Sequence, residues 1–423
     1  MIEKFKNDIY NFELGVLLEN CLPNTIDTTV YPSFQNGRAS TFVITGDIEA
    51  MWLRDSTAQV WPYLFLLQTD GQLRQLIEGV IRRQLQCILV DPYANAFNQK
   101  PNGSPWLEDQ TEMHPLVYER KWEVDSLCYA VRLVHGYWKA TGDRSILDSE
   151  WSEAMHRIVE TFIQQQRKQG AGPYRFQRAA FAASDSLPIE GRGYPTAPVG
   201  LICSSFRPSD DATLLSFLIP ANLFAALSLR QIAELMEVGP GNTAFAHKCI
   251  RLAEEIESAV KAYGIHEHPT FGRIYAYEVD GYGGRVFMDD ANVPSLLSLP
   301  YLGCCSSADP VYQATRAFAL SSANPWWFRG DAAEGIGSPH TGLNRIWPLG
   351  IIMRGLTSTN DEEICECLRM LISTTAETGF MHEAFDKDDP GNFSRSWFAW
   401  ANSLFGEWLL KLHAEKPKLL RQM

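Results

Sequence analysis

Apolar side chains recur at intervals of three to four positions along most of this chain, which is the spacing of amphipathic helices. The pattern predicts helices over residues 56–67, 73–89, 124–140, 148–166, 212–235, 244–263, 312–320, 345–356, 362–375 and 397–410. A stretch at 9–18 and a short element around Leu296 bring the expected total to about twelve. Alternation typical of strands is confined to short pieces such as 42–44 and 273–279.

Six polar clusters stand just where predicted helices begin. All six contain carboxylates or amides, and five of them also contain Arg, Trp or both. They occupy residues 51–56, 121–126, 207–211, 288–292, 340–345 and 392–397. Asp, Asn and Ser at these places satisfy free backbone N–H groups at a helix start. Arg and Trp do not cap helices, so capping alone does not account for the clusters. Helices packed side by side with their starts at one end would bring all six clusters into one pit.

The order of the elements predicts an all-α fold. No Pro- or Ser-rich linker divides the chain, so we expect a single domain over residues 1–423. About twelve helices arranged as six hairpins, with one polar cluster for each hairpin, correspond to an (α/α)6 toroid. The longer connections, at about 91–120, 174–209 and 266–289, would then form the rim of the pit.

Charge and composition narrow the classes of partner. A formal net charge of −13 argues against binding nucleic acid or an anionic membrane, since both need a concentrated basic surface. No apolar run approaches the roughly 20 residues that span a bilayer. The acidic start does not resemble a secretory signal, and the nine cysteines show no disulfide framework, so a cytoplasmic location is expected. The oligomeric state cannot be inferred.

Carboxylates, Arg and Trp in one pit suit an uncharged polyol. The polar groups bind vicinal hydroxyls, while Trp faces cover the apolar side of a sugar ring. Glycoside hydrolysis needs two carboxyl groups, one protonated acid and one base or nucleophile. The adjacent pair Asp210 and Asp211 is a candidate for the acid, because like charges raise the pKa of one member. Glu383, a lone carboxylate among apolar neighbours, is the candidate for the base.

Asp210 and Glu383 could instead have purely structural roles. Asp210 could cap a helix that begins near Ala212, and Glu383 could pair with His382 or Arg395. A metal site is not expected, because His266 and His268 lie in a turn without a third ligand at a recognisable spacing. No Gly-rich phosphate loop follows a strand, so no cofactor is expected either.

Several of these segments resemble a known enzyme family, from near residue 9 to residue 410. The matching motifs are Met51-Trp52-Leu53-Arg54-Asp55-Ser56, Phe206-Arg207-Pro208-Ser209-Asp210-Asp211, Asp289-Asp290-Ala291-Asn292-Val293-Pro294-Ser295, Gly337-Ser338-Pro339-His340-Thr341-Gly342, His382-Glu383 and Trp397-Phe398-Ala399-Trp400-Ala401-Asn402. They are similar to those of glycoside hydrolase family 125, the exo-α-1,6-mannosidases. The motifs occur in the same order as in that family.

The resemblance implies an (α/α)6 barrel and an inverting, metal-independent enzyme that removes terminal α-1,6-linked mannose from N-glycan or mannan fragments. It places the general acid in the Asp210–Asp211 pair, with Asp210 preferred, and the general base at Glu383. The other matched positions would contact the sugar in the deepest subsite: Trp52, Arg54, Asp55, Asp211, Asp289, Asp290, Asn292, His340 and Arg345.

Two other functions are compatible with a toroid. Isoprenoid cyclases share the shape but use acidic clusters to bind Mg²⁺ and diphosphate, and the expected Asp-rich motif is not evident in this sequence. A non-catalytic carbohydrate-binding protein would hold mannosides without needing a pair of carboxyl groups across the glycosidic bond.

Overall fold

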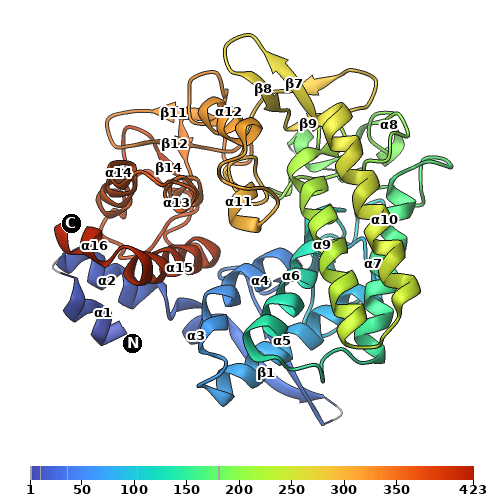
Figure 1. The fold of residues 1–423 in the computed structure, drawn as a ribbon, viewed down its shortest axis with the longest axis horizontal. Coiled ribbons are helices and arrows are strands. Elements are labelled where there is room, and N and C mark those ends of the chain that lie inside the picture. The colour runs from blue at the N-terminus through green and yellow to red at the C-terminus, as the bar shows by residue number, and fades with distance from the viewer. Residues whose placement is uncertain (1, 10, 36, 102, 180–181) are drawn as a thin grey trace.

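The computed structural model describes the chain except residues 1, 10, 36, 102 and 180–181. Its main helices alternate between an inner and an outer ring, which is the arrangement of an (α/α)6 barrel (Figure 1). The inner helices are α4 (Leu53–Val60), α6 (Val124–Thr141), α9 (Ile219–Val238), the short α11 (Leu299–Leu302), α13 (Pro348–Leu356) and α15 (Ala399–Glu415). The outer helices are α2 (Phe12–Cys21), α5 (Gly71–Val90), α7 (Ser149–Gln165), α10 (Thr243–Ala259), α12 (Pro310–Ala319) and α14 (Asp361–Ser373).

The ring closes between the two ends of the chain. Helix α15 packs against both α4 and α2, so the last inner helix meets the first inner and the N-terminal outer helix. Shorter helices complete the fold: α1 (Ile2–Asp8), α3 (Asn24–Thr28), α8 (Pro188–Gly191), α16 (Pro417–Gln422), η1 (Trp61–Leu66), η2 (Ala183–Asp185) and η3 (Val260–Gly264). The N and C labels consequently lie on the same side of the molecule in Figure 1.

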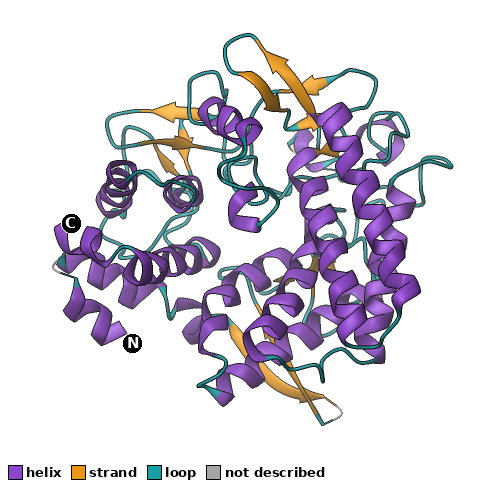
Figure 2. Ribbon diagram, in the orientation of Figure 1, coloured by secondary structure: helices purple, strands orange, loops and turns teal. Residues whose placement is uncertain are grey.

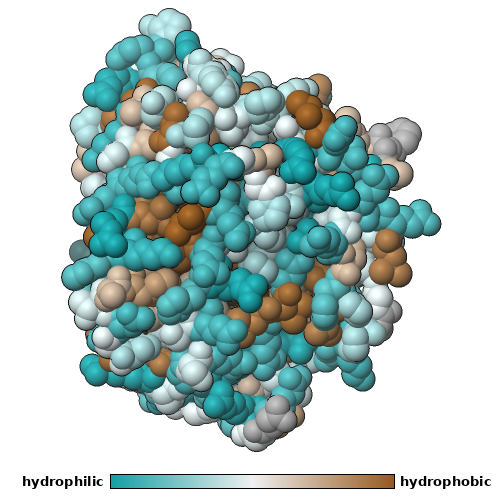
Figure 3. All heavy atoms as spheres, turned by 90° about the vertical axis from the view of Figure 1, so that its right-hand side faces the viewer, coloured by the Kyte–Doolittle hydropathy of each residue, from teal (hydrophilic) through white to brown (hydrophobic). Residues whose placement is uncertain are grey.

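The two rings differ in burial because of where they lie. All residues of α4 are buried, as expected for a helix enclosed by other helices. Outer helices such as α7 and α10 bury one stripe of apolar side chains and expose polar residues on the other side. Figure 3 views the side on which α7 and α10 lie, and that face is mostly hydrophilic with small apolar patches. The 3.6-residue periodicity thus reports the outer ring more clearly than the inner one.

Short strands occur between the helices, as the contrast of purple and orange in Figure 2 shows. The antiparallel pairs are β1 (Val30–Gln35) with β2 (Arg38–Val43), β7 (Ile265–His268) with β8 (Gly272–Tyr275), β11 (Trp327–Arg329) with β12 (Glu334–Ile336), and β13 (Arg345–Ile346) with β14 (Phe385–Asp386). Two three-stranded sheets have the orders β3 (Met51–Trp52), β4 (Ala96–Phe97), β5 (Val117–Glu119) and β10 (Arg285–Val286), β9 (Glu278–Val279), β6 (Phe217–Leu218). The expected strands at 42–44 and 273–279 correspond to parts of β2, β8 and β9, whereas β1 was not predicted.

Several helix starts differ from the sequence-based prediction, and three of them follow the third, fourth and fifth polar clusters. The helix expected from residue 212 begins at Ile219, and the one expected from 345 begins at Pro348. In both, a proline in the first turn marks the true start, since proline fits there and lacks the N–H that later positions need. The short element expected around Leu296 is α11, which begins at Leu299. The third, fourth and fifth polar clusters therefore lie in loops ahead of the helices.

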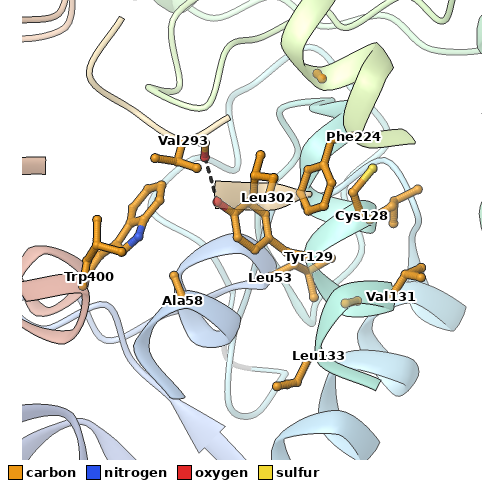
Figure 4. Close-up of a cluster of buried hydrophobic side chains, with 14 of the residues drawn as sticks. Leu53, Ala58, Cys128, Tyr129, Val131, Leu133, Phe224, Val293, Leu302 and Trp400 are labelled. Carbon is orange, nitrogen blue, oxygen red and sulfur yellow. Dashed lines mark hydrogen bonds between the residues drawn. The ribbon is translucent and has the colours of Figure 1, made fainter. Parts of the chain in front are cut away.

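The Tyr129 side chain of α6 lies in a cluster of buried hydrophobic side chains and connects several elements of the barrel (Figure 4). Its ring makes edge-to-face contacts with Phe224 of α9, at a centroid distance of 5.2 Å, and with Trp400 of α15, at 6.3 Å. Its hydroxyl donates a 3.0 Å hydrogen bond to the carbonyl oxygen of Val293. Buried aromatic pairs with a satisfied hydroxyl fix their neighbours in place. Tyr129 therefore anchors the loop that carries Asn292 to two inner helices.

None of the helices formed by the described residues is long and apolar enough to cross a membrane.

Candidate active site

One pocket is lined by residues from five of the six polar clusters, all except the cluster at 121–126. Its walls come from α4 and its preceding strand, from the start of α15 and from loops between helices. The lining residues are Thr45, Ile48, Trp52, Arg54, Asp55, Pro208, Ser209, Asp210, Asn292, His340, Trp347, Glu383, Arg395, Phe398 and Trp400. Seven residues singled out from the sequence are among them: Trp52, Arg54, Asp55, Asp210, Asn292, His340 and Glu383.

Arg54 lies at one side of this pocket and contacts four carboxyl groups. Its Nη1 atom lies 2.6 Å from Glu123 Oε2 and 3.2 Å from Asp125 Oδ2. Its Nη2 atom lies 3.3 Å from Asp210 Oδ1, and its Nε atom 3.5 Å from Asp55 Oδ2. The guanidinium also lies beside the Trp400 ring, 5.8 Å from the centroid. A single positive charge therefore holds carboxyl groups from three segments distant in the sequence.

The carboxyl groups around Arg54 differ in their tendency to hold a proton. Burial raises the pKa of Asp55 to about 6 and that of Asp125 also to about 6, although Arg54 opposes the shift. Burial raises the pKa of Glu123 well above its ordinary range. Burial acts in the same direction on Asp210, but the positive charges of Arg54 and Lys121 outweigh it and hold its pKa at about 2.

The expectation that the adjacent charges of Asp210 and Asp211 raise the pKa of one member of the pair is wrong. The pKa of Asp211 is also lowered, because burial is outweighed by a hydrogen bond with His340 and another from Ser209. Each carboxylate faces its own positive group, so attraction to these cations exceeds the repulsion between the two neighbours. Their side chains also diverge, since Asp210 lines the pocket of the polar clusters and Asp211 lines an adjoining apolar cavity.

Asp210 lies in a loop rather than at a helix N-terminus, so it does not cap a helix beginning near Ala212. Its backbone adopts a left-handed conformation with φ of 66°, which is costly for residues other than glycine and tolerated best by Asn and Asp. The turn is fixed by a 2.7 Å hydrogen bond from Arg207 N to Asp211 O. Lys121 Nζ donates to the carbonyl oxygen of Asp210 at 2.7 Å. These contacts aim the Asp210 carboxylate into the pocket.

Glu383 is held through both of its carboxylate oxygens. Ser394 Oγ donates a 2.7 Å hydrogen bond to Oε2, and Arg395 Nε lies 3.4 Å from Oε1. Of the two pairings considered from the sequence, the structure contains the one with Arg395. His382 instead directs its ring nitrogens at main-chain carbonyl oxygens and stacks on Phe393. Glu383 is thus an oriented carboxylate that still lines the pocket.

His340 places a further positive group in the pocket, beside Arg54 and Arg395. Its Nδ1 atom lies 3.5 Å from Asp211 Oδ2, and its ring contacts Trp347 at a centroid distance of 6.3 Å. Burial would lower the pKa of His340, but the hydrogen bond and charge of Asp211, with smaller contributions from Asp210 and Glu383, raise it to about 9. His340 is therefore an imidazolium at neutral pH and can donate a hydrogen bond to a ligand.

Three further residues expected at the sugar lie outside the pocket lining. Asp289 is fully buried and accepts hydrogen bonds from the backbone N–H groups of Leu296 and Leu297 at 2.8 and 2.9 Å. Asp290 accepts from the backbone and side chain of Asn292, so it orients a residue that does line the pocket. Arg345, the first residue of β13, donates to Asn392 in the loop after β14.

Several pocket residues were not singled out from the sequence as site residues. Phe398 and Trp400 stand in a motif that the family resemblance had already marked, and Arg395 had been considered as a partner for Glu383. Trp347 carried no signal, because a tryptophan before a helix is more often part of the core. Glu123 and Asp125 belong to the second polar cluster, and their role emerges only from their contacts with Arg54.

The arrangement as a whole suits an uncharged sugar. Trp52, Trp347, Phe398 and Trp400 offer aromatic surface, while Asn292, His340 and Arg395 offer hydrogen-bond donors. Three carboxyl groups line the pocket. Asp55 is paired with the neighbouring Arg54, while Asp210 and Glu383 come from two loops far apart in the chain. Glycoside hydrolysis requires such a pair flanking one bond.

Comparison with known proteins identifies the family. The metal-independent α-mannosidase family GH125 matches residues 11–410. The meiotically up-regulated gene 157 protein of the fission yeast Schizosaccharomyces pombe is 42% identical over 441 residues, covering 100% of this chain and 86% of the yeast protein. A metal-independent α-mannosidase structure from Streptococcus pneumoniae, a non-productive complex with α-1,6-mannobiose, is 41% identical with a TM-score of 0.94 and covers 98% of this chain and 97% of its own.

More distant structures share the fold alone. A GH78 rhamnosidase from Bacillus sp. GL1 superposes with a TM-score of 0.56 at 13% identity, over 96% of this chain and 35% of the rhamnosidase. The similarity to the GH125 proteins is much stronger: the family match extends along residues 11–410, and two relatives are more than 40% identical to this chain. This chain belongs to the GH125 family of metal-independent α-mannosidases.

Proposed function

We propose that this protein is an exo-acting α-1,6-mannosidase that removes terminal non-reducing mannose from N-glycan or mannan fragments with inversion at the anomeric carbon. The observation that carries the proposal is the convergence of Asp210 and Glu383 on one pocket in a GH125 chain. The streptococcal relative, whose structure contains α-1,6-mannobiose, supports the choice of linkage.

In the proposed mechanism Asp210 protonates the glycosidic oxygen while Glu383 takes a proton from a water molecule that attacks the anomeric carbon from the opposite face. β-Mannose is then the first product. An inverting pair must leave room for that water, so its carboxyl groups lie about 6.5–9.5 Å apart, compared with about 5–5.5 Å in retaining enzymes. The hydrogen bond from Ser394 and the contact with Arg395 support the role of Glu383, because they orient its carboxylate.

The remaining pocket residues are proposed to bind the sugar. Trp52, Asn292 and His340 line the pocket from different segments, and their donors and aromatic surface match the faces of a pyranose ring. Arg54 is paired with Asp55 and with the carboxyl group of Glu123. The proposed role of Arg54 and Asp55 is therefore to set the charge around Asp210. Asp211 is proposed to act through His340.

The experiment that tests the proposal is proton NMR of the enzyme with α-1,6-, α-1,2- and α-1,3-mannobiose. Cleavage of the α-1,6-linked disaccharide alone, with β-mannose appearing before mutarotation, is the expected result. α-Mannose as the first anomer would exclude the inverting assignment, and preference for another linkage would exclude the proposed substrate. A non-catalytic carbohydrate-binding protein would shift the resonances of mannobiose without releasing mannose.

A further inference from the structure

One end of the β3–β4–β5 sheet carries the groups that contact Asp210. In this sheet Trp52 of β3 pairs with Ala96 of β4, and Ala96 pairs with Glu119 of β5. Because neighbouring strands are antiparallel, the residues that follow β3, precede β4 and follow β5 lie at the same end of the sheet. These residues include Arg54, Asn95 and Lys121.

Asn95 is a fully buried amide whose orientation is determined by its neighbours. Its Oδ1 atom accepts a 3.1 Å hydrogen bond from the backbone N–H of Lys121, a group that cannot accept one. The NH₂ group must therefore point the other way. Its Nδ2 atom donates to Glu119 Oε2 at 3.0 Å and to Asp210 Oδ1 at 3.3 Å. Both hydrogens of the amide are thus directed at carboxyl groups.

The two carboxyl oxygens of Asp210 have different surroundings. Oδ1 accepts hydrogen bonds from Asn95 Nδ2 and from Arg54 Nη2, each at 3.3 Å. Oδ2 has no hydrogen-bond partner within the part of the chain that the structure describes, and it is not among the buried polar atoms that lack one. The side chain is 26% exposed and lines the pocket. Oδ2 is therefore the oxygen that is open to a ligand.

The backbone of Asp210 is held from the same end of the sheet. Lys121 Nζ donates a 2.7 Å hydrogen bond to the carbonyl oxygen of Asp210, and the Lys121 side chain is buried. Because Asp210 has a left-handed φ of 66°, this contact stabilises a conformation that costs free energy. The main chain and the side chain of Asp210 are thus both fixed by residues next to β4 and β5.

We infer that Asn95 is a positioning residue for the general acid: together with Arg54 it occupies Oδ1 of Asp210, so that Oδ2 carries the proton delivered to the glycosidic oxygen. The inference rests on the proposed function, because it takes Asp210 as the acid. A proton on Oδ1 would face two groups that only donate, whereas a proton on Oδ2 faces the pocket.

The proton transfer at Asp210 then involves one oxygen only. The Oδ2–H bond breaks as the glycosidic oxygen takes the proton, and the electron pair of the broken C–O bond stays with that oxygen. Asp210 is left as a carboxylate. The proton that Glu383 removes from the attacking water passes to solvent, and solvent returns a proton to Asp210 Oδ2 before the next turnover.

A neutral amide suits this position because Arg54 alone does not hold the carboxyl group. The guanidinium of Arg54 also contacts three other carboxyl groups. Asn95 adds a second donor to Oδ1 without adding a positive charge. A charged donor would bind the ionised form of Asp210 more strongly and oppose its protonation. The amide of Asn95 therefore orients the acid at a smaller cost to its protonated form.

The test compares two substrates in the variant Asn95→Leu, which keeps a side chain of similar size and removes the donor. The expected result is a fall in kcat for α-1,6-mannobiose of about 100-fold with little change in KM, since misplacing a reacting group by about 1 Å can cost that much. Hydrolysis of α-mannosyl fluoride, whose leaving group needs no protonation, should stay close to that of the wild-type enzyme. Circular dichroism verifies folding.

The matched control is Asn98→Leu, which removes a second buried amide just after β4. Asn98 Nδ2 donates to the carbonyl oxygens of Pro115 and Val117, at 3.3 and 3.2 Å, rather than to Asp210. The control should leave kcat for both substrates unchanged. Wild-type turnover of mannobiose by Asn95→Leu, or an equal loss with both substrates, would overturn the inference and leave Asn95 with a purely structural role.

A crystal structure tests the inference even if Asn95→Leu does not fold. In the variant Glu383→Gln with α-1,6-mannobiose bound, the glycosidic oxygen should lie within hydrogen-bond distance of Asp210 Oδ2. Asn95 Nδ2 should remain in contact with Oδ1. A glycosidic oxygen nearer to Oδ1 than to Oδ2 would overturn the inference.

Failure of the inference can be told apart from failure of the proposed function. If Asp210 is the acid, Asp210→Asn loses mannobiose turnover and keeps activity on the fluoride, whatever Asn95 does. If Asp210→Asn retains mannobiose turnover, the assignment of the acid itself is wrong. A defective Asp210→Asn combined with a fully active Asn95→Leu would leave the mannosidase assignment in place and remove only the role of Asn95.

Discussion

The Nε atom of Arg395 lies 3.4 Å from Oε1 of Glu383, and the same arginine places Nη1 3.2 Å from Oδ1 of Asp47. Arg395 therefore joins the carboxylate proposed to position water to a loop near the N-terminus. The Asp47 side chain is 54% exposed and Glu383 9% exposed, so the contact reaches from the rim of the pocket to its interior. The orientation of Glu383 therefore depends on Arg395, whose contact with Asp47 connects the last part of the chain to a loop near the N-terminus.

Replacing Arg395 by Gln is expected to lower kcat for α-1,6-mannobiose by about 100-fold, because misplacing a reacting group by about 1 Å can cost that much. The measurement is steady-state kinetics with circular dichroism to verify folding. Arg230→Gln, which removes an arginine paired with Glu257 on the outer surface, is the control and should behave like the wild-type enzyme. A normal kcat in the Arg395 variant would mean that Glu383 is oriented without it.

Glu383→Gln and Asp210→Asn should differ on α-mannosyl fluoride. Both variants are expected to lose about 10²–10⁴-fold in turnover of mannobiose. Only the Glu383 variant should also lose turnover of the fluoride, since attack by water still needs a base when the leaving group needs no acid. Fluoride release measured with an ion-selective electrode checks this. Equal behaviour of the two variants on the fluoride would contradict the separate roles.

The ion pair of His340 with Asp211 should make stability depend on pH in the alkaline range. The pKa of His340 is about 9 in the folded protein and about 6.5 in an unfolded chain. A raised pKa means that the stabilisation is fully present below pH 6.5 and is lost as the pH rises through 9. Asp211→Asn should lower the pKa of His340, which NMR titration of the imidazole measures. A titration midpoint unchanged by the substitution would contradict the pairing.

Asp289→Ala should destabilise the fold and leave the chemistry intact. The substitution strands the buried N–H groups of Leu296 and Leu297, which costs about 1–3 kcal/mol. Denaturant unfolding measures the change in free energy of unfolding. KM for mannobiose at a temperature where the variant is folded should stay near the wild-type value. A large rise in KM with unchanged stability would restore Asp289 as a sugar contact.

Removal of metal ions is expected to leave turnover unchanged. Dialysis against EDTA followed by assay with α-1,6-mannobiose, before and after addition of Mg²⁺, checks this. Loss of activity that Mg²⁺ restores would point to the cyclase type of chemistry considered for a toroid, in which acidic clusters bind the metal.

The helices were predictable wherever one side of the helix faces solvent. The expected helix at 73–89 corresponds to α5 (Gly71–Val90), because its apolar stripe alternates with exposed polar residues. The start of α9 was not predictable in this way. The apolar pattern continues ahead of the helix, through Leu214, Leu215, Phe217 and Leu218. Those residues instead enter a loop and β6, and Glu278 accepts hydrogen bonds from Leu214 N and Leu215 N.

The candidate site was predictable at the level of which segments meet and not at the level of which side chains face inward. Trp52, Asp210 and His340 line the pocket, while Asp289 and Asp290, close to Asn292 in sequence, turn away from it. A loop can point neighbouring side chains in opposite directions, and nothing in its residue types reveals which. Glu123 gave no signal of its own, because its contact with Arg54 joins positions that are 69 residues apart in the chain.

Periodicity and motif order are properties of neighbouring residues, so the amino-acid sequence was enough to predict the helical class, the order of the elements and the family. The protonation and orientation of the site side chains depend on the folded arrangement. Arg54 meets partners 69, 71 and 156 positions away in the chain, so the charge that each carboxylate experiences depends on how the ring closes. Electrostatic interactions act through space and depend on burial, and neither distance nor burial is written in the order of the residues.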